Sequence, residues 1–315
     1  MSAIQELSDF VSTDHTLITV GVFDGVHVGH QALFRRLVSQ SSRAGLKSGV
    51  ITFRQHPLTF LAPQNAPPRL ASNEENLVLI KSQGVDFVIP LTFDAELAMI
   101  DARTFAMLLQ HHLRMKAMIL GWDFVMGYHR SGTLTTLSNL GKELGFTTDT
   151  IQAVTIDGET VSSTSIRRSL AEGNTNKAAA MLGRPFSLEG MVIRGMGRGV
   201  ELGFPTANID IDQNLVVPAE GVYATRVHLD GQVYQSVTAI SRCPTFEGGG
   251  RTIEVHLLNF DADIYHRKIR VDIIEQLRLV QRYDSAILLK EQIARDIERA
   301  KEVLNNKLTG NQSNY

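Results

Sequence analysis

The sequence predicts an α/β domain followed by an antiparallel β domain. Up to about residue 180, short apolar runs alternate with helical patterns, which is typical of βαβ units and a parallel sheet. After Gly183, Arg184 and Pro185 the rhythm changes to period-2 runs, which indicate antiparallel strands. A chain of 315 residues also exceeds the ~100 to 200 residues of one ordinary domain. We therefore expect two domains, residues 1–183 and 184–315.

In the first domain, a buried strand is expected at Leu17–Phe23 and a helix at Gln31–Arg43, where apolar residues recur with helical spacing. The other expected strands are Gly49–Phe53, Phe87–Leu91, Met118–Leu120 and Ile151–Val154. The other expected helices are Asn73–Ser82, Ala102–His112 and Thr135–Leu144. This order of elements supports a parallel sheet with helices packed against it.

In the second domain, period-2 runs predict strands at Gly221–Leu229, Val233–Ile240, Thr252–Leu258 and Lys268–Ile274. Asp230-Gly231 lies between the first two, and the glycine supplies the positive φ that a type I′ hairpin turn requires. The final segment, Ser285–Leu304, begins with a helix-capping serine and keeps its apolar residues roughly on one face. These features predict an antiparallel sheet or small barrel with a terminal helix.

Composition argues against several classes of protein. The 31 Lys and Arg nearly balance the 33 Asp and Glu, and a formal net charge of -2 argues against a broad nucleic-acid-binding surface. The single cysteine, Cys243, allows no intramolecular disulfide, which fits a reducing compartment. No signal peptide is read at the start, and no apolar run approaches the ~18 residues of a membrane-spanning helix. We therefore expect a cytoplasmic protein that binds neither membranes nor nucleic acid.

A first candidate site follows the first predicted strand and precedes the first predicted helix. Its residues are Gly21, Phe23, Asp24, Gly25, His27, Gly29 and His30. Phosphates bind at the carboxyl ends of parallel strands and at helix N-termini, where free N–H groups and the helix dipole favour anions. Two histidines there can donate hydrogen bonds to phosphate oxygens, which suits nucleotidyl transfer. The alternative is that one histidine caps the helix and the other is exposed.

Two further segments are candidates for phosphate contact. The glycine-rich segment Gly121–Gly132, with Asp123, follows another predicted strand and so opens on the same edge of the sheet. Hydroxyl groups at Ser163 and Thr164 precede Arg167 at a helix start, where an arginine can grip phosphates bidentately. Taken alone, the first segment also fits an ordinary turn, and the second an N-cap with a surface arginine.

The second domain has its own glycine-rich segment, from Gly195 to Asn208. Its backbone amides can approach phosphates closely, while Thr206 and Asn208 supply neutral oxygens suited to Mg²⁺. Glu254 lies in the alternating run Thr252–Phe260. A glutamate that faces inward beside a phosphate site can act as the general base for a hydroxyl nucleophile. The alternative is a solvent-facing strand glutamate.

Together, these motifs resemble the bacterial bifunctional riboflavin kinase/FAD synthetase family. The first domain is similar to a Rossmann-like nucleotidyltransferase in three segments: Phe23–His30, Gly121–Gly127 and Ser163–Arg167. The second is similar to a riboflavin kinase β-barrel in Gly197–Gly199, Leu202–Asn208, Gly221–Tyr223, Pro244–Phe246 and Glu254–Leu258. The resemblance covers roughly Thr16 to Arg299. It implies two ATP-dependent reactions, the phosphorylation of riboflavin to FMN and the adenylylation of FMN to FAD with release of pyrophosphate.

The resemblance also implies a role for each motif. In the adenylyltransferase domain, His27, His30 and Arg167 would be catalytic. Residues that would bind ATP or its phosphates are Gly21, Phe23, Asp24, Gly25, Gly29, Asp123, Ser163 and Thr164 there, and Gly195, Gly197, Arg198 and Gly199 in the kinase domain. Thr206 and Asn208 would hold Mg²⁺. Glu254 would accept the hydroxyl proton, and Arg278 would contact the flavin.

The sequence departs from the family pattern at Gln55, Asn76, Ser241–Cys243, Asn259 and His266, and none of these residues is assigned chemistry above. Two other classes stay open: an enzyme with one of the two activities, and a flavin- or RNA-binding regulator built on an inactive enzyme fold. Both sets of motifs are intact, which favours the bifunctional enzyme. A tRNA synthetase is disfavoured because the sequence has no Lys-Met-Ser-Lys-Ser-like segment. We expect a monomer or a homo-oligomer.

Overall fold

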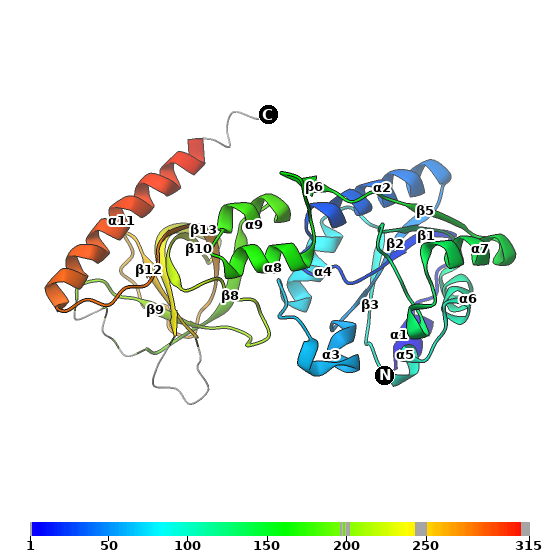
Figure 1. Ribbon diagram of the computed structural model, residues 1–315, viewed down its shortest axis with the longest axis horizontal. Helices are drawn as coiled ribbons and strands as arrows, with labels where there is room; N and C mark the ends of the chain where they lie inside the picture. The colour runs from blue at the N-terminus through cyan, green and yellow to red at the C-terminus, as the bar shows by residue number, and fades with distance from the viewer. Residues whose placement is uncertain (1, 196, 198, 200–201, 243–250, 310–315) are drawn as a thin grey trace. The chain divides into compact units, whose positions relative to one another are not determined.

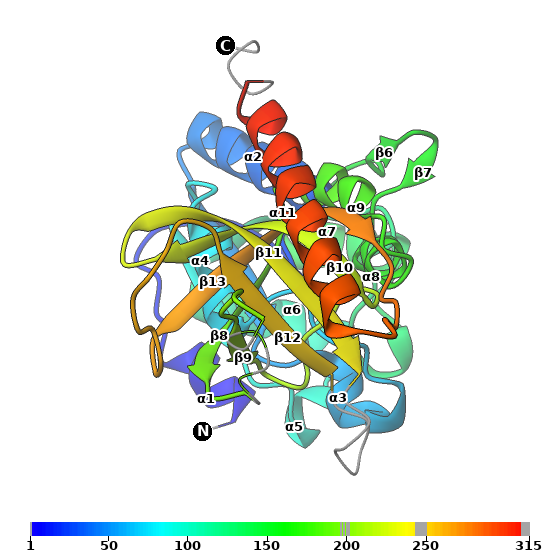
Figure 2. The same ribbon diagram turned by 90° about the vertical axis from the view of Figure 1, so that its left-hand side faces the viewer.

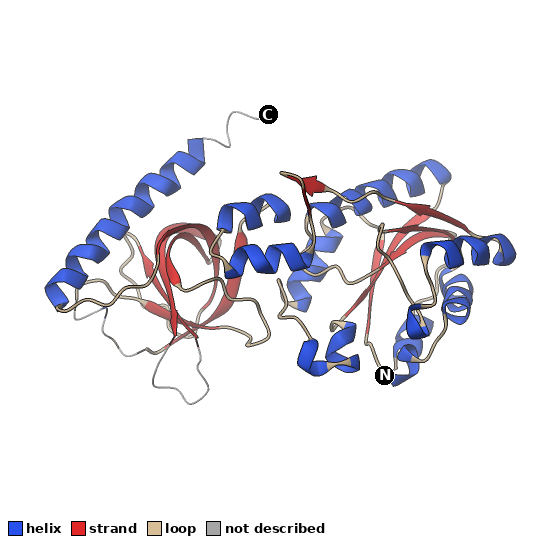
Figure 3. Ribbon diagram, in the orientation of Figure 1, coloured by secondary structure: helices blue, strands red, loops and turns tan. Residues whose placement is uncertain are grey.

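The computed structural model describes residues 2–195, 197, 199, 202–242 and 251–309. The chain forms two compact units, Met1–Ser163 and Thr164–Tyr315 (Figure 1). Strands and helices alternate in the first unit, whereas strands dominate the second (Figure 3). The helices α8 (Ser163–Ala171) and α9 (Thr175–Leu182) precede residue 183, where the sequence places the domain boundary. That boundary between functional domains stays a prediction.

A parallel sheet forms the centre of the first unit, with strand order β3-β2-β1-β4-β5. The strands are β1 (Thr16–Val20), β2 (Lys47–Phe53), β3 (Phe87–Leu91), β4 (Met115–Leu120) and β5 (Thr147–Thr150). β1 pairs with β2 on one side and with β4 on the other. The strand order therefore reverses at β1, and ligands of such sheets bind at this point, outside the carboxyl ends of the strands.

Helices cover both faces of this sheet (Figure 1). On one face, the core joins Leu33, Phe34 and Leu37 of α2 (Val28–Ala44) to Ile80 of α4 (Asn73–Lys81). The core of the other face contains residues of α1 (Ala3–Ser8), α5 (Ala95–Ala98), α6 (Ala102–Leu113) and α7 (Leu134–Leu144). The unit also contains α3 (Pro57–Leu61) and a small ribbon of β6 (Thr155–Ile156) and β7 (Glu159–Thr160). Burial on both faces explains why the inner strands are almost continuously apolar.

The predicted helices and most predicted strands of this unit are confirmed, but the last strand is misplaced. β5 spans Thr147–Thr150, whereas the apolar pattern predicts Ile151–Val154, so this prediction is wrong. β5 is an edge strand that pairs with β4 on one side, and its polar side chains stay partly exposed. Because none of the four side chains of β5 is fully buried, the strand needs no apolar run. The first strand also ends earlier than predicted, at Val20.

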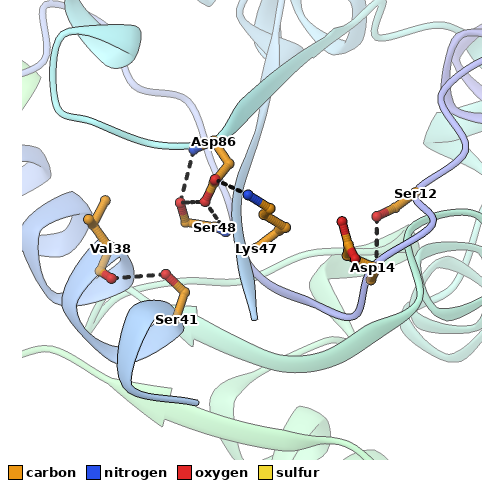
Figure 4. A network of polar contacts seen from close by, with 7 residues as sticks. All are labelled: Ser12, Asp14, Val38, Ser41, Lys47, Ser48 and Asp86. Carbon is orange, nitrogen blue, oxygen red and sulfur yellow. Dashed lines mark hydrogen bonds and ion pairs between the residues drawn. The ribbon is translucent and has the colours of Figure 1, made fainter. Parts of the chain in front are cut away.

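A polar network joins the amino-terminal ends of β2 and β3 (Figure 4). The carboxylate of Asp86 accepts hydrogen bonds from the Ser48 amide at 2.8 Å and the Ser48 hydroxyl at 2.6 Å, and pairs with Lys47 at 3.0 Å. Burial opposes the ionisation of Asp86, but these partners outweigh it and lower the pKa of the carboxyl below its ordinary value. The network therefore stabilises the edge of the sheet that lies opposite the carboxyl ends of the strands.

A closed antiparallel barrel forms the second unit, with strand order β10-β11-β12-β9-β8-β13 (Figure 2). The strands are β8 (Phe186–Ile193), β9 (Ala207–Asp210), β10 (Gly221–Leu229), β11 (Gln232–Arg242), β12 (Arg251–Leu257) and β13 (Lys268–Arg278). The period-2 runs predict β10 to β13 but not β8 and β9, which close the barrel between β12 and β13. The predicted hairpin turn is confirmed, because Asp230 and Gly231 both have positive φ, 52° and 78°.

The terminal helix α11 (Ala286–Thr309) lies against β10, β11 and β13 on the outside of the barrel (Figure 2). Its residues Ile297, Ala300 and Val303 pack with Val222 and Val237 of the barrel. This confirms the predicted amphipathic helix. α9 packs against β8 and β13. Within the described residues, no helix combines the length and the apolarity that crossing a membrane requires.

Candidate active sites

The first predicted site lies where β1 ends and α2 begins. His27 is the N-cap of α2, and its Nδ1 accepts the N–H of His30 at 3.3 Å. The rings of His27 and His30 stack with centroids 3.6 Å apart, and Phe23 meets His30 edge-on at 5.1 Å. The structure therefore brings both predicted histidines together. It also gives His27 the capping role that the sequence left open as the alternative.

Both histidines are neutral near pH 7. Burial lowers the pKa of His27 to about 4. Burial, and then the charge of His27, lower the pKa of His30 well below its ordinary value. Because Nδ1 of neutral His27 accepts a hydrogen bond, its proton sits on Nε2, which makes Nε2 a donor. Nδ1 of His30 is buried and has no hydrogen-bond partner among the described residues. The pair can therefore contact a phosphate without carrying a positive charge.

The glycines of this segment make room for its own side chains. A Cβ at Gly29 would lie 3.1 Å from the ring of His27, and a Cβ at Gly21 would lie 2.9 Å from the ring of Phe23. Gly25 has a φ of +75°, a left-handed conformation that glycine adopts without strain. Close packing at Gly21 and Gly29 and the positive φ of Gly25 therefore each favour glycine at these positions. Their predicted contacts with ATP stay predictions.

Asp24 fixes this loop to a neighbouring segment of the chain. Both oxygens of its buried carboxylate accept the N–H of Leu70 at 3.0 Å, and one also accepts the N–H of Ala71 at 3.4 Å. Asn76, a departure from the family pattern, accepts the N–H of Gly25 at 2.8 Å. A carboxylate repels a phosphate, so these contacts favour a loop-ordering role for Asp24 over direct contact with ATP phosphates.

The second predicted segment lies on the same edge of the sheet, because β4 is the neighbour of β1. Gly121 follows β4 directly, and Asp123 is exposed. Reciprocal hydrogen bonds between the backbones of Met126 and Gly132, at 3.1 and 2.9 Å, close the loop. A Cβ at Gly132 would lie 2.8 Å from the Cβ of Ala102, so the loop packs closely on α6. This packing holds Asp123 at the carboxyl edge of the sheet.

Ser163 connects the third predicted segment to the first. Its hydroxyl donates a hydrogen bond to the carbonyl of Asp24 at 3.0 Å. α8 begins at Ser163, as the hydroxyl-rich sequence predicts. Thr164 and Arg167 follow in α8 and belong to the second compact unit. Their contact with phosphates at the histidine pair stays a prediction.

In the second unit, the barrel register assembles the other predicted site. β9 pairs with β12 so that Asn208 lies directly opposite Glu254. Directly opposite residues of antiparallel strands share one face, with Cβ atoms ~4.5 to 5.5 Å apart. A side chain at Gly195 would collide with the amide of Asn208, and a Cβ at Gly199 would lie 2.9 Å from Oγ1 of Thr206. The structure therefore places Glu254 beside Asn208, to which it is distant in sequence, and keeps Gly195 against Asn208 and Gly199 against Thr206.

Glu254 lies on the outer face of the barrel and not inward, which differs from the orientation considered from the sequence. Ile253 and Val255 are buried, and their side chains fill the interior. Alternation along β12 therefore directs Glu254 to the face on which α11 packs. The side chain is half-buried there. On this face, Glu254 can meet a substrate that approaches from outside the barrel.

Gly197 belongs to the same glycine-rich segment as Gly195, and Arg198 lies outside the described residues. Gly197 has a φ of +73°, and a Cβ there would meet nothing within 4 Å. In the described part of the chain, no three His, Cys, Asp or Glu side chains form a group that could hold a metal ion. Thr206 and Asn208, the residues predicted to hold Mg²⁺, carry neutral oxygens, which suit a hard cation.

Arg278 is held by a residue that the sequence analysis missed. Asp296 of α11 accepts hydrogen bonds from Nε of Arg278 at 2.9 and 3.0 Å and from its Nη2 at 2.8 Å. The two side chains are 19% and 7% exposed, and the guanidinium lies 5.7 Å from the ring centroid of Tyr283. Arg278 thus ties β13 to α11, and its flavin contact stays a prediction. The available signal was an acid between Ile293 and Ile297 on the apolar side of the helix.

Two family models match the chain. The FAD synthetase model matches residues 10–165, and the riboflavin kinase model matches residues 182–304. The first match covers the parallel sheet and its helices, and the second covers the barrel and most of α11. Each model therefore coincides with one of the two candidate sites.

Known relatives are similar over nearly the whole chain. The bifunctional riboflavin kinase/FMN adenylyltransferase of Escherichia coli strain K12 is 38% identical over 91% of this chain and 92% of that protein. The protein of the same description from Haemophilus influenzae is 34% identical over 91% of this chain and 94% of that protein. A crystal structure described as a macrolide-efflux protein from Streptococcus pneumoniae has a TM-score of 0.87 and 28% identity, covering 94% and 96% of the two chains. The chain therefore belongs to the family of bifunctional riboflavin kinase/FMN adenylyltransferases.

Proposed function

We propose that the two candidate sites carry out the two reactions of this family. The barrel half transfers the γ-phosphoryl group of ATP to the 5′-hydroxyl of riboflavin and forms FMN. The other half joins FMN to AMP from a second ATP, which gives FAD and pyrophosphate. One observation carries the assignment of residues: two separate sets of predicted side chains each come together, His27 with His30 and Glu254 with Asn208.

In the kinase half, Glu254 is the general base. It accepts the proton of the riboflavin hydroxyl while that oxygen forms a bond to the γ-phosphorus of ATP and the bond to the leaving ADP breaks. Thr206 and Asn208 are the residues that would hold Mg²⁺, because their oxygens are neutral, hard ligands beside a glycine-rich segment. When bound, the cation would neutralise charge on the ATP phosphates. Gly195 and Gly199 keep that segment close to the two side chains.

In the adenylyltransferase half, no covalent enzyme intermediate is required, because an oxygen of the FMN phosphate is already a nucleophile. It bonds to the α-phosphorus of ATP, and pyrophosphate leaves. Catalysis then consists of positioning the reactants and stabilising the developing charge. His27 donates from Nε2, and His30 lies against it. Thr164 and Arg167 are proposed to hold the leaving pyrophosphate.

Some assignments are supported by the sequence and by the extent of the family matches. We place the functional domains at residues 1–183 and 184–315, because the FAD synthetase match ends at residue 165 and the riboflavin kinase match begins at 182. A cytoplasmic location and the absence of a nucleic-acid partner are supported by the single cysteine and the balanced charge. The enzyme is proposed to act as a monomer or a homo-oligomer.

The test is to incubate the pure protein with riboflavin, ATP and MgCl₂ and to separate the flavins by chromatography. FMN should form first and FAD later, and EDTA should suppress FMN formation. FMN that accumulates without any FAD would contradict the adenylyltransferase assignment. Supplied FMN that becomes FAD, while riboflavin is not phosphorylated, would contradict the kinase assignment. Flavin binding without either product would favour a regulator.

A further inference from the structure

One row of side chains crosses the outer face of the barrel at Glu254. The register places Arg278 opposite Val222, Val222 opposite Ala239, Ala239 opposite Glu254, and Glu254 opposite Asn208. Directly opposite residues share a face. Neighbouring strands are ~4.8 Å apart, so Arg278 lies three strands, roughly 14 Å, from Glu254. The row therefore runs from a cation, across two small apolar residues, to the proposed base and the proposed metal ligand.

Ala239 is the smaller of the two apolar residues in this row, and it lies directly opposite Glu254. Its neighbours Thr238 and Ile240 are buried inside the barrel, so Ala239 points outward. Val237, two residues earlier on the same face, is buried in the cluster beneath α11. Ala239 does not belong to that cluster and keeps part of its surface exposed. An alanine there ends at its Cβ, whereas a larger side chain would extend beside Glu254 on the same face.

Phosphoryl transfer determines which side of Glu254 each substrate occupies. The attacking and leaving oxygens lie roughly in line with the phosphorus, so the acceptor and ATP approach from opposite sides. Thr206 and Asn208, on the β9 side of Glu254, are the residues proposed for Mg²⁺ and ATP phosphates. The β11 side, where Ala239 is the directly opposite residue, is left for the acceptor.

We propose that Ala239 forms the floor of the subsite for the acceptor alcohol and limits which alcohols reach Glu254. This inference rests on the proposed kinase function. The reactive hydroxyl of riboflavin ends a flexible polyol chain, and that chain must pass over the residue next to the base. A small apolar side chain lets the polyol chain lie against the strand. A large one would lift the hydroxyl away from the carboxylate.

The decisive variant is Ala239→Leu. Its kcat/KM for riboflavin should fall at least about tenfold, because a misfit of one methylene or more in a specificity pocket has an effect of that size. Its KM for ATP should stay within about twofold of the wild-type value, since the ATP side of the site is unchanged. Ala239→Ser, which is close in size, should resemble the wild type. Val233→Leu is the matched control, because Val233 lies on the same strand and face but is 55% exposed at the far end.

The full-length variants are compared by thermal unfolding and by FAD formation from supplied FMN, which monitors the other half. If Ala239→Leu does not fold, Ala239→Val replaces it, because β-branched residues favour strands. A selective loss of riboflavin kcat/KM supports the proposal. A folded Leu or Val variant with wild-type kcat/KM for riboflavin overturns it. So does a variant whose KM for ATP rises by as large a factor as its kcat/KM for riboflavin falls. Failure of the proposed kinase function would give a different result from failure of this inference, because the wild type itself would then make no FMN.

Discussion

Asparagine in place of His27 separates the two roles that the structure gives this side chain. Asparagine is a favoured N-cap, so its oxygen can accept the His30 N–H that Nδ1 of His27 now accepts at 3.3 Å. It does not reproduce the donor at Nε2. Alanine removes the cap and the donor together. Both variants should therefore lose FAD formation roughly 10²- to 10³-fold, the usual effect of one oriented donor, while only alanine should also lose ~1 kcal/mol of cap stability.

The pKa of His27 gives the magnitude of a further, acid-dependent effect. Burial lowers it from 6.5 to about 4, and each pKa unit corresponds to ~1.4 kcal/mol. Between pH 6.5 and 4, the unfolded chain binds this proton more readily than the folded chain does. The free energy of unfolding is therefore not reduced by His27 above pH 6.5. It falls as the pH is lowered, by on the order of 3 kcal/mol once the pH is below 4. Neither variant titrates there, so both should lose less stability in acid.

The assay combines thermal unfolding at pH 7 and pH 4.5 with FAD formation from FMN at pH 7. FMN formation from riboflavin on the same preparations should be unchanged. If His27→Asn forms FAD at the wild-type rate while His27→Ala does not, His27 acts through the cap alone and the donor role is refuted. If the Tm of His27→Asn falls with acid as steeply as that of the wild type, the acid argument is refuted.

Three other predictions address separate parts of the molecule. Fragment 184–315 should make FMN but no FAD, as chromatography of the flavins would show. Fragment 164–315 should have the same activity but a higher Tm, measured by circular dichroism, because it retains α9 packed on β8 and β13. Asp296→Ala should destabilise the protein by ~3 kcal/mol or more because it leaves a mostly buried guanidinium unpaired. Glu302→Ala, at an exposed pair of the same helix, should cost less than ~1 kcal/mol, and equal Tm losses would contradict this reasoning. Asp86→Asn should lower the Tm at pH 7. The difference in Tm between this variant and the wild type should shrink below pH 3.8, because the hydrogen bonds of Asp86 lower its pKa in the folded protein below that value. A Tm difference that stays constant with pH would argue against this.

The sequence predicted where the candidate sites lie better than how their residues contact one another. The βαβ rhythm correctly placed the Gly21–His30 segment at the junction of β1 and α2, because local periodicity determines that order, although α2 already begins at Val28. The pairing of Asn208 with Glu254 depends on strand register, which motif spacing does not contain. The contact of Arg278 with Asp296 depends on how α11 docks on the barrel, which is a tertiary property.

Side-chain direction was the other part that the sequence left open. The alternating pattern around Glu254 defines two faces of β12 but does not say which one is the barrel interior. Burial of Ile253 and Val255 decides it. The polar composition of β5 similarly concealed a strand, because side chains that are not fully buried need not be apolar.

The paired assay of Glu254→Gln tests the central claim, that each half holds its own active site, most directly. Glutamine keeps the size of the side chain but removes the basic oxygen, so riboflavin phosphorylation should fall by roughly 10² or more, the usual range for a positioned general base. The conversion of supplied FMN to FAD by the same preparation should proceed at the wild-type rate. Near-normal phosphorylation of riboflavin, or equal loss of both reactions, would contradict the claim.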